Sequence, residues 1–305
     1  MLDALCGLTP ALSRLPASAL LAKRFSRKSR FFSLIEFWQN HLTDFSFTRR
    51  QDCVLQPLGI KLSIRDVVPH QLNTYFEAAR KYRFVYENDR VFMFIGSFEF
   101  ELPFPQGILE LRETFENDTY GFFDVKDNVV VDVGAFIGDS AVYFAGRSAQ
   151  KVVAFEASPF LAHFAKVNVG LNGFGGKVTV VNKAVFDSDG VTCFTVQRNL
   201  FGSSSAVKSF KEGTRFEIPT VSLSTLVDEL GHIDLLKLDC EGSEHVIVRQ
   251  AFETKALSCI DKILMEVHGL EYRELLQSLQ KARFKILKMD RYLPDLHFLI
   301  AERQG

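Results

Sequence analysis

The chain has 305 residues, enough for one large domain or for one domain with a smaller appendage. Its residues are 47% hydrophobic and include 30 Phe, so the chain can bury a packed core. The formal net charge of -1 excludes a global attraction to nucleic acid or to an anionic membrane, and no run of about 18 apolar residues predicts a membrane span.

Residues 1–126 are predicted to form an N-terminal extension of mixed α+β structure. Residues 1–50 combine basic residues with Leu, Phe and Trp, and we expect a helical start that packs on the rest of the protein with a basic outer face. A nucleic-acid grip or a helix at a membrane surface is the alternative for this segment. A helix is expected around Leu72–Tyr82. Short strands are expected at Phe84–Tyr86, Val91–Ile95 and Phe98–Leu102, with a hairpin turn at Gly96-Ser97.

Residues 127–305 show the pattern of a parallel sheet covered by helices. Continuous apolar runs alternate with helical stretches, as in strands that are buried on both faces. Helices are predicted up to Ala145 and from Pro159 to Val169, with the proline at the first helical position. Strands are predicted at Val129–Val133, Lys151–Phe155, Lys177–Val181, Ile233–Leu238, Ile260–Val267, Phe284–Leu287 and Leu296–Ala301.

Two connections in this region depart from the parallel pattern. The link Lys288–Asp295 is too short for a parallel crossover, so the last strand is predicted to run antiparallel beside its neighbour. Val191–Val196 and Phe216–Val221 are predicted to pair as a hairpin inserted at the carboxyl edge of the sheet, where ligands bind in such folds. The polar residues between these two strands form a candidate substrate lid.

The segment Asp132-Val-Gly-Ala-Phe-Ile-Gly-Asp139 follows the first strand and is predicted to bind a nucleotide. Gly134 and Gly138 permit a tight turn and a close approach of the backbone to a ligand. The loop lacks the third glycine of a dinucleotide fingerprint. Asp132 and Asp139 would repel a pyrophosphate but suit a ligand with an ammonium and a sulfonium group. The loop therefore favours S-adenosylmethionine over NAD.

Glu156 ends the second strand, 24 residues after Asp132, and is predicted to accept hydrogen bonds from both ribose hydroxyls of that ligand. Such bonds to a charged group contribute about 1.5–3 kcal/mol each. A glycine loop alone is commonly only a turn, and a strand-end Glu is commonly a solvated charge. Their combination at this spacing favours the nucleotide site. Ala135, Ala157 and Ala184 complete the predicted cofactor-binding set.

Charged residues also lie within the strand-like run Ile233–Gly242. Because side chains alternate along a strand, Lys237, Asp239 and Glu241 are predicted to point the same way. A buried lysine requires an ion-pair partner, and Asp132 and Asp239 are the candidates. A structural ion pair and a catalytic role stay open for Lys237, whereas Asp239 and Glu241 are expected to contact a ligand.

His268 ends the next strand and could act as a general base near neutral pH, or simply as a hydrogen-bonded strand-end histidine. His245 is assigned a structural or solvated role.

These features resemble the FkbM family of methyltransferases. The resemblance spans roughly Asn128 to His268, and this chain has Glu156-Ala157 where the family commonly has Glu-Pro. It implies a class I methyltransferase fold, a Rossmann-like, mostly parallel seven-stranded sheet with an antiparallel last strand. It also implies methyl transfer from S-adenosylmethionine, often to a hydroxyl of a sugar or other small metabolite. The matching stretches are Val131–Asp139, Val153–Pro159, Asn168–Asn172, Ile233–Glu244 and Met265–His268.

The hypothesis that follows is an in-line attack of an acceptor oxygen on the methyl carbon. Asp239 and His268 are the candidate bases, and Glu241 is expected to orient the acceptor. A metal-assisted route through Asp239, Glu241 and Glu266 ranks lower because Lys237 would already supply a local cation. No metal is therefore predicted.

Two rival classes are a methyltransferase-like module that binds the cofactor or an RNA without turnover, and an NAD-dependent oxidoreductase. The chain lacks the third glycine and a clear Tyr-x-x-x-Lys proton donor, both of which the second class would require. We expect a small-molecule acceptor, no nucleic-acid partner and at most weak peripheral membrane contact through the basic N-terminus. Five scattered cysteines without a CxxC pair indicate reduced thiols and a cytoplasmic location.

Overall fold

The computed structural model describes residues 45–47, 52–55, 60–63, 77–78, 80–88, 90–103, 106–196, 214–270 and 272–305. The chain divides into two compact units, Met1–Leu109 and Glu110–Gly305. The predicted helical start lies outside the described residues, as does most of the helix expected at Leu72–Tyr82, of which residues 77–78 and 80–81 are described as helical.

Small antiparallel sheets make up much of the described part of the first unit. The predicted hairpin is confirmed as β4 (Arg83–Glu87), β5 (Arg90–Ile95) and β6 (Phe98–Leu102), with Gly96 at φ 60 in the turn between the last two.

The meander of β1 (Phe45–Phe47), β2 (Asp52–Leu55) and β3 (Ile60–Ser63) was not predicted. Strands of three or four residues are too short to show a clear alternation in the sequence.

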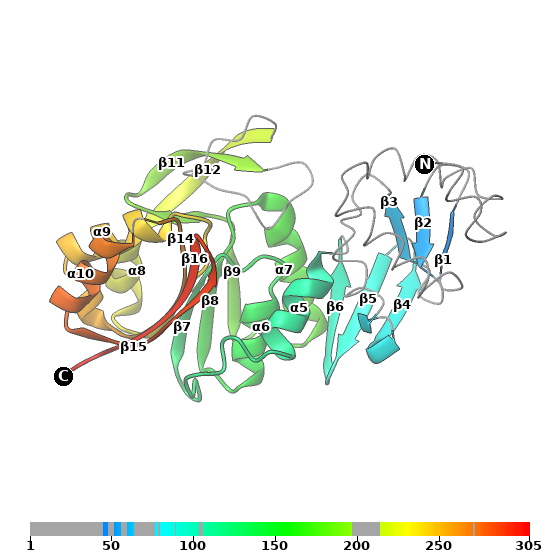
Figure 1. Cartoon of the computed structure of the whole chain (residues 1–305), viewed down its shortest axis with the longest axis horizontal. Coiled ribbons are helices and arrows are strands. Elements are labelled where there is room, and N and C mark those ends of the chain that lie inside the picture. Colours follow the sequence, from blue (N-terminus) through cyan, green and yellow to red (C-terminus); the bar gives the residue numbers. More distant parts are fainter. Residues whose placement is uncertain are drawn as a thin grey trace. The chain divides into compact units, whose positions relative to one another are not determined.

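A seven-stranded sheet with the order β15-β16-β14-β13-β7-β8-β9 forms the centre of the second unit (Figure 1). The five neighbouring strands β14, β13, β7, β8 and β9 are parallel to one another. β16 (Leu296–Arg303) runs antiparallel to both of its neighbours, β14 and β15 (Phe284–Leu293). The predicted fold class, with its antiparallel last strand, is therefore confirmed. The parallel strands are β7 (Val129–Val133), β8 (Lys151–Phe155), β9 (Val178–Val181), β13 (Ile233–Leu238) and β14 (Ile260–His268).

The last hairpin is longer than the sequence indicated. β15 continues to Leu293 and pairs there with Leu296, so the connection is Pro294-Asp295 and not the whole of Lys288–Asp295. Charged residues such as Lys288 and Asp290 concealed this extension, because β15 is an edge strand whose side chains are partly exposed.

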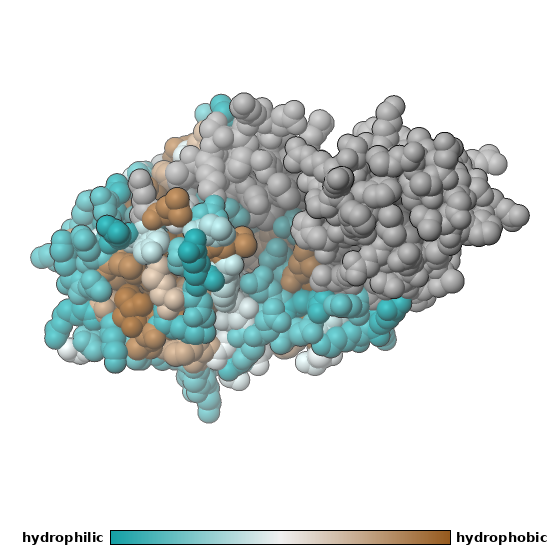
Figure 2. Space-filling view, viewed as in Figure 1, coloured by the Kyte–Doolittle hydropathy of each residue, from teal (hydrophilic) through white to brown (hydrophobic). Residues whose placement is uncertain are grey.

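Helices cover both faces of the sheet (Figure 1). α6 (Asp139–Gly146) and α7 (Pro159–Leu171) lie on one face, and α8 (Leu223–Leu230), α9 (Glu244–Glu253) and α10 (Arg273–Lys281) lie on the other. α7 begins as predicted, with Pro159 in its first turn and the Ser158 side chain accepting a hydrogen bond from the Leu161 amide. On the face seen in Figure 2, the described surface is mostly hydrophilic, with apolar residues gathered near α10 and β15.

The predicted inserted hairpin is also confirmed. β11 (Gly190–Val196) pairs antiparallel with β12 (Thr214–Ser222), and β12 additionally pairs in parallel with β10 (Ala184–Phe186). The candidate lid between β11 and β12 lies outside the described residues, so its closing role stays a prediction. Within the described part of the chain, no helix has both the length and the apolar character needed to cross a membrane.

Candidate active site

The glycine loop between β7 and α6 packs directly on the end of β13. Gly134 has φ 82, and a Cβ at this position would lie only 1.7 Å from the carbonyl oxygen of Asp239. Gly138 has φ 87, and a Cβ there would approach the Cα of Ala165 in α7 to 3.0 Å. The amides of Gly134 and Ala135 both donate to the carbonyl of Phe155, at 2.9 and 3.0 Å. The loop is therefore held in one conformation by β8, β13 and α7.

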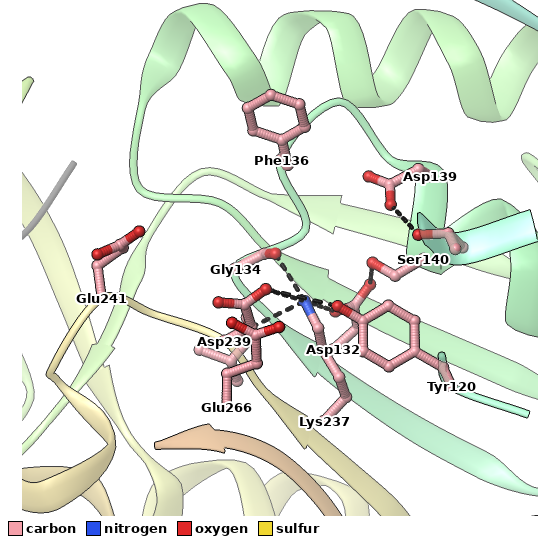
Figure 3. A network of polar contacts seen from close by, with 12 residues as sticks. Tyr120, Asp132, Gly134, Phe136, Asp139, Ser140, Lys237, Asp239, Glu241 and Glu266 are labelled. Atoms are coloured by element: carbon pink, nitrogen blue, oxygen red, sulfur yellow. Dashed lines mark hydrogen bonds and ion pairs between the residues drawn. The ribbon is translucent and has the colours of Figure 1, made fainter. Parts of the chain in front are cut away.

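A buried ion pair lies beneath this loop (Figure 3). Asp132 is fully buried, accepts a 2.7 Å hydrogen bond from the Ser140 hydroxyl and lies 3.2 Å from Lys237 Nζ. The same ammonium donates to the Gly134 carbonyl at 2.8 Å and lies 4.0 Å from Asp239. Burial alone would lower the pKa of Lys237, but the charges of Asp132, Asp239 and Asp139 outweigh burial and raise it. Lys237 is therefore a charged group that fixes the loop through its backbone.

Asp139 is engaged elsewhere, at the start of α6. The Thr114 hydroxyl donates to its carboxylate at 2.6 Å. Burial raises the pKa of Asp139 to about 6, against the opposing effects of Thr114 and Lys237. Both loop carboxylates thus have partners inside the protein, and their contact with cationic groups of a ligand stays a prediction.

Glu156 lies at the end of β8 beside the loop. Its two carboxylate oxygens accept hydrogen bonds from the backbone amides of Phe136 and Ser158, at 2.9 and 2.8 Å. Burial raises the pKa of Glu156 to about 7, although both amide hydrogen bonds act to lower it. A carboxylate has about four acceptor positions, so two remain for hydroxyl donors.

Asn182, which was not predicted, supports this end of β8 by donating to the carbonyls of Glu156 and Ala157, at 2.8 and 3.0 Å. Ala184 is buried in a small cluster with Phe194 and Ile218, and Ala157 packs against that cluster. The assignment of Ala157 and Ala184 to cofactor binding stays a prediction.

A second group of titratable side chains gathers at the carboxyl ends of β13 and β14. One ligand atom from each of Asp239, Glu266 and His268 lies within 4.8 Å of the others, a spacing that could accommodate a metal ion. Figure 3 shows Asp239 and Glu266 side by side above Lys237. Burial and the charges of Asp239 and Glu113 raise the pKa of Glu266, which favours its protonated form.

Tyr120 closes one side of this group. Its hydroxyl donates to the Asp239 carboxylate at 3.4 Å, and its ring lies 5.3 Å from Lys237 Nζ. The Asp239 side chain nevertheless stays 29% exposed, so it is accessible to a ligand.

His268 is held by acidic neighbours. Its Nδ1 is hydrogen-bonded to the fully buried Glu244, and its Nε2 lies 3.7 Å from Glu241 and 3.9 Å from Glu266. Burial acts to lower the pKa of His268, but the Glu244 hydrogen bond and the charges of Glu244, Glu241 and Asp239 raise it overall. The ring therefore favours its charged form. His245 bonds the His268 carbonyl at 2.7 Å, in line with a structural role.

Glu241 does not share the direction expected from strand alternation. β13 ends at Leu238, and Glu241 has φ 55, so the alternation stops before it. Its side chain lies apart from the Asp239–Glu266 pair (Figure 3).

The family model of the methyltransferase FkbM domain matches residues 132–300. The chain belongs to this family. Among solved structures, the chain is similar to a ribosomal protein L11 methylase from Lactobacillus delbrueckii subsp. bulgaricus, with 15% identity over 65% of this chain and 78% of that chain and a TM-score of 0.39.

The chain is also similar to the magnesium protoporphyrin IX methyltransferase of Synechocystis PCC 6803, with 12% identity over 67% of this chain and 85% of that chain and a TM-score of 0.41. Both likenesses are too distant to indicate an acceptor. No curated protein matches the chain significantly.

S-adenosylmethionine is the cofactor of this FkbM domain, and the residues present fit it. At Gly134 and Gly138 the glycine loop has no room for a Cβ, so its backbone packs closely against Asp239 and Ala165. Glu156 offers two further acceptor positions beside that loop, as a ribose requires.

Three polar residues of the FkbM site come from outside the matched stretches and were not predicted. Glu113 and Thr114 lie in α5 (Gly107–Phe115), and Tyr120 follows it. Tyr120 and Asp239 are 119 positions apart, so no spacing in the sequence connects them.

Proposed function

We propose that this protein transfers a methyl group from S-adenosylmethionine to a hydroxyl oxygen of a sugar or other small metabolite. The observation that supports this most is the place of Asp239. Its backbone touches the glycine loop at Gly134, and its partly exposed carboxylate is oriented by Tyr120. A proton acceptor next to the cofactor loop is what an alcohol acceptor needs.

Asp239 is the proposed general base. An alcohol is a weak nucleophile until its proton is removed, and removal by a positioned base contributes about 10²–10⁴-fold. S-adenosylmethionine supplies an electrophilic methyl group. The raised pKa of Glu266 favours its protonated form, which can donate a hydrogen bond to an acceptor oxygen beside Asp239. Most of the remaining effect is positioning, which can contribute about 7–11 kcal/mol.

His268 and Lys237 have positioning roles in this proposal. A raised pKa disfavours the neutral imidazole that could accept a proton, so His268 ranks below Asp239 as the candidate base. His268 instead lies at the end of β14 and contacts the carboxylates of Glu241 and Glu244 through its two ring nitrogens. Lys237 holds the Gly134 carbonyl and compensates the charges of Asp132 and Asp239.

The carboxylates of this site disfavour a phosphate-rich acceptor, because Asp239, Glu113 and Glu241 would repel it. This supports a small neutral acceptor over an RNA. A metal among Asp239, Glu266 and His268 would have to coexist with Lys237, which lies 4.0 Å from Asp239, so the proposed route uses none. Cysteines 193, 240 and 259 are free thiols, which supports the proposed cytoplasmic location.

The test is transfer of labelled methyl from S-adenosylmethionine to a panel of hydroxylated compounds. Asp239→Asn should lower kcat by about 10²–10⁴-fold while cofactor affinity is kept, and His268→Asn should lower it less. Asp228→Asn, at an exposed position of α8, is the matched control. Full turnover by Asp239→Asn would overturn the assignment of the base. Cofactor binding without transfer to any hydroxyl would favour the binding-module alternative.

A further inference from the structure

A cavity of about 590 Å³ opens beside the group formed by Asp239, Glu266 and His268, on the side of β15 and β16. No role is assigned to it by the mechanism above. Its described lining includes Glu113, Asn117, Phe122, Lys288, Tyr292 and Phe298.

The cavity adjoins the reacting groups through two of its lining residues. The Phe298 ring lies 6.3 Å from the ring of Tyr120, which donates to Asp239, and Phe298 is the register partner of Glu266 across β14 and β16. Glu113 is close enough to Asp239 for the charge of Asp239 to raise the pKa of Glu113. The cavity therefore lies next to residues that contact or pair with Asp239 and Glu266.

Two exposed aromatic rings, Tyr292 and Phe122, line this cavity, and the buried Phe298 supports Tyr292. Tyr292 and Phe298 are stacked with an interplanar angle of 8° and a centroid distance of 5.9 Å. Tyr292 is 47% exposed and Phe122 is 53% exposed. Large aromatic side chains usually bury most of their surface, so two exposed rings at one cavity indicate a surface that packs against a ring-shaped ligand.

The charges of the lining select against an anion. Lys288 is the one cation among the described lining residues, and it is paired with Asp290 at 2.6 Å. Asp118 faces Arg147 at 3.2 Å, and Glu113 adds a further carboxylate toward Asp239. Carboxylates that accept hydrogen bonds favour hydroxyl donors and repel phosphates.

We propose that this cavity is the acceptor subsite, and that the acceptor is an uncharged ring bearing hydroxyl groups that stacks on Tyr292 and presents one hydroxyl to Asp239. The methylation of that hydroxyl rests on the proposed function above. The binding itself does not depend on turnover. The ring can be saturated, as in a glycoside, or aromatic, as in a phenol, because both stack on an aromatic face.

Ligand-observed NMR on the full chain saturated with S-adenosylhomocysteine tests the subsite. The probes are methyl glycosides, simple phenols such as catechol, and glucose 6-phosphate as the anionic counterpart. Binding of at least one neutral ring, weakened about five- to tenfold by Tyr292→Ala and restored by Tyr292→Phe, is the expected result. Glucose 6-phosphate should bind more weakly than methyl glucoside. Leu293→Ala, at the exposed neighbour that does not line the cavity, is the control.

The outcomes separate this inference from the proposed function. Binding of a neutral ring that depends on Tyr292 but is not followed by methyl transfer would support the subsite and contradict the proposed O-methylation. Methyl transfer that is unaffected by both Tyr292→Ala and Phe122→Ala would overturn the subsite and leave the proposed function in place. Absence of binding by every neutral ring at millimolar concentration, or preferential binding of the phosphate, would also overturn it.

Discussion

Glu156 shows how one buried side chain can be prepared for a ligand. Two backbone amides hold its carboxylate, yet burial keeps its pKa at about 7, well above the usual value for Glu. Hydrogen bonds from hydroxyl groups favour the ionised carboxylate. Binding of a ribose should therefore favour ionisation of Glu156, and protonation should oppose binding.

Glu156→Gln is expected to weaken binding of S-adenosylhomocysteine about ten- to a hundredfold, because a hydrogen bond to a charged acceptor is lost. In the unchanged protein, affinity should fall by up to about tenfold per pH unit below pH 7, because a proton must then leave Glu156. Calorimetric titration between pH 5.5 and 8 checks both effects. Glu229→Gln, at an exposed position of α8, should change neither. A pH dependence that persists in Glu156→Gln would assign it to another group.

At the scale of elements, the site depends on the contact between the glycine loop and the end of β13. Gly134 brings the loop against the Asp239 carbonyl, and Lys237 of β13 donates to the Gly134 carbonyl. The glycine loop, which is predicted to bind the cofactor, and the end of β13, which leads into the proposed base Asp239, are thus one packed unit.

Gly134→Ala should disrupt this unit. The new Cβ would lie 1.7 Å from backbone, and the residue would be held at φ 82, so both a clash and a conformational penalty apply. Gly173→Ala is the matched control, because Gly173 has φ 72 and nothing within 4 Å of an added Cβ. We expect a loss in the free energy of unfolding of roughly 1–2 kcal/mol for the control and of roughly 3–5 kcal/mol for Gly134→Ala, measured by urea denaturation. Equal losses would show that the loop can move away from β13.

At the scale of the whole molecule, the site concentrates buried carboxyl groups whose pKa values are raised. Burial is the main cause that raises the pKa of Asp139 to about 6, of Glu156 to about 7 and of Glu266 to about 10. Each of these groups binds its proton more tightly in the folded protein than in the unfolded chain. Their protonated forms therefore stabilise the fold, and this contribution is lost as the pH rises through the folded pKa.

The free energy of unfolding of the cofactor-free protein should accordingly fall between pH 5.5 and pH 7.5. Each group that is protonated only in the folded state contributes about 1.4 kcal/mol per pH unit. Asp189 and Asp261 have lowered pKa values and contribute only at more acidic pH, so they do not oppose this trend. Urea denaturation at both pH values measures it, and Glu266→Gln should reduce the slope. A stability that rises with pH, with the same slope in Glu266→Gln, would contradict this account.

The sequence by itself determined the central sheet and the position of the glycine loop within it. The strands β7, β8, β9, β13 and β14 are mostly apolar runs, and the loop and Glu156 are separated by a fixed short stretch of one βαβ unit. Such signals are local, because each strand or turn is specified by residues next to one another. The same local character explains the failures. The short strands β1 to β3 carry too few residues to show a pattern, and the charged end of β15 resembles a loop.

Only the tertiary structure decided which side chains meet at the site and how they ionise. Thr114 reaches Asp139 across 25 positions and Tyr120 reaches Asp239 across 119, and no periodicity connects such pairs. The cavity at Tyr292 likewise requires α5, the residues after it and the β15–β16 hairpin to be assembled. The raised pKa of Glu266 follows from burial and from carboxylates that are distant in sequence. Burial and charge proximity are properties of the packed chain, so they become defined only when the sheet and its helices have come together.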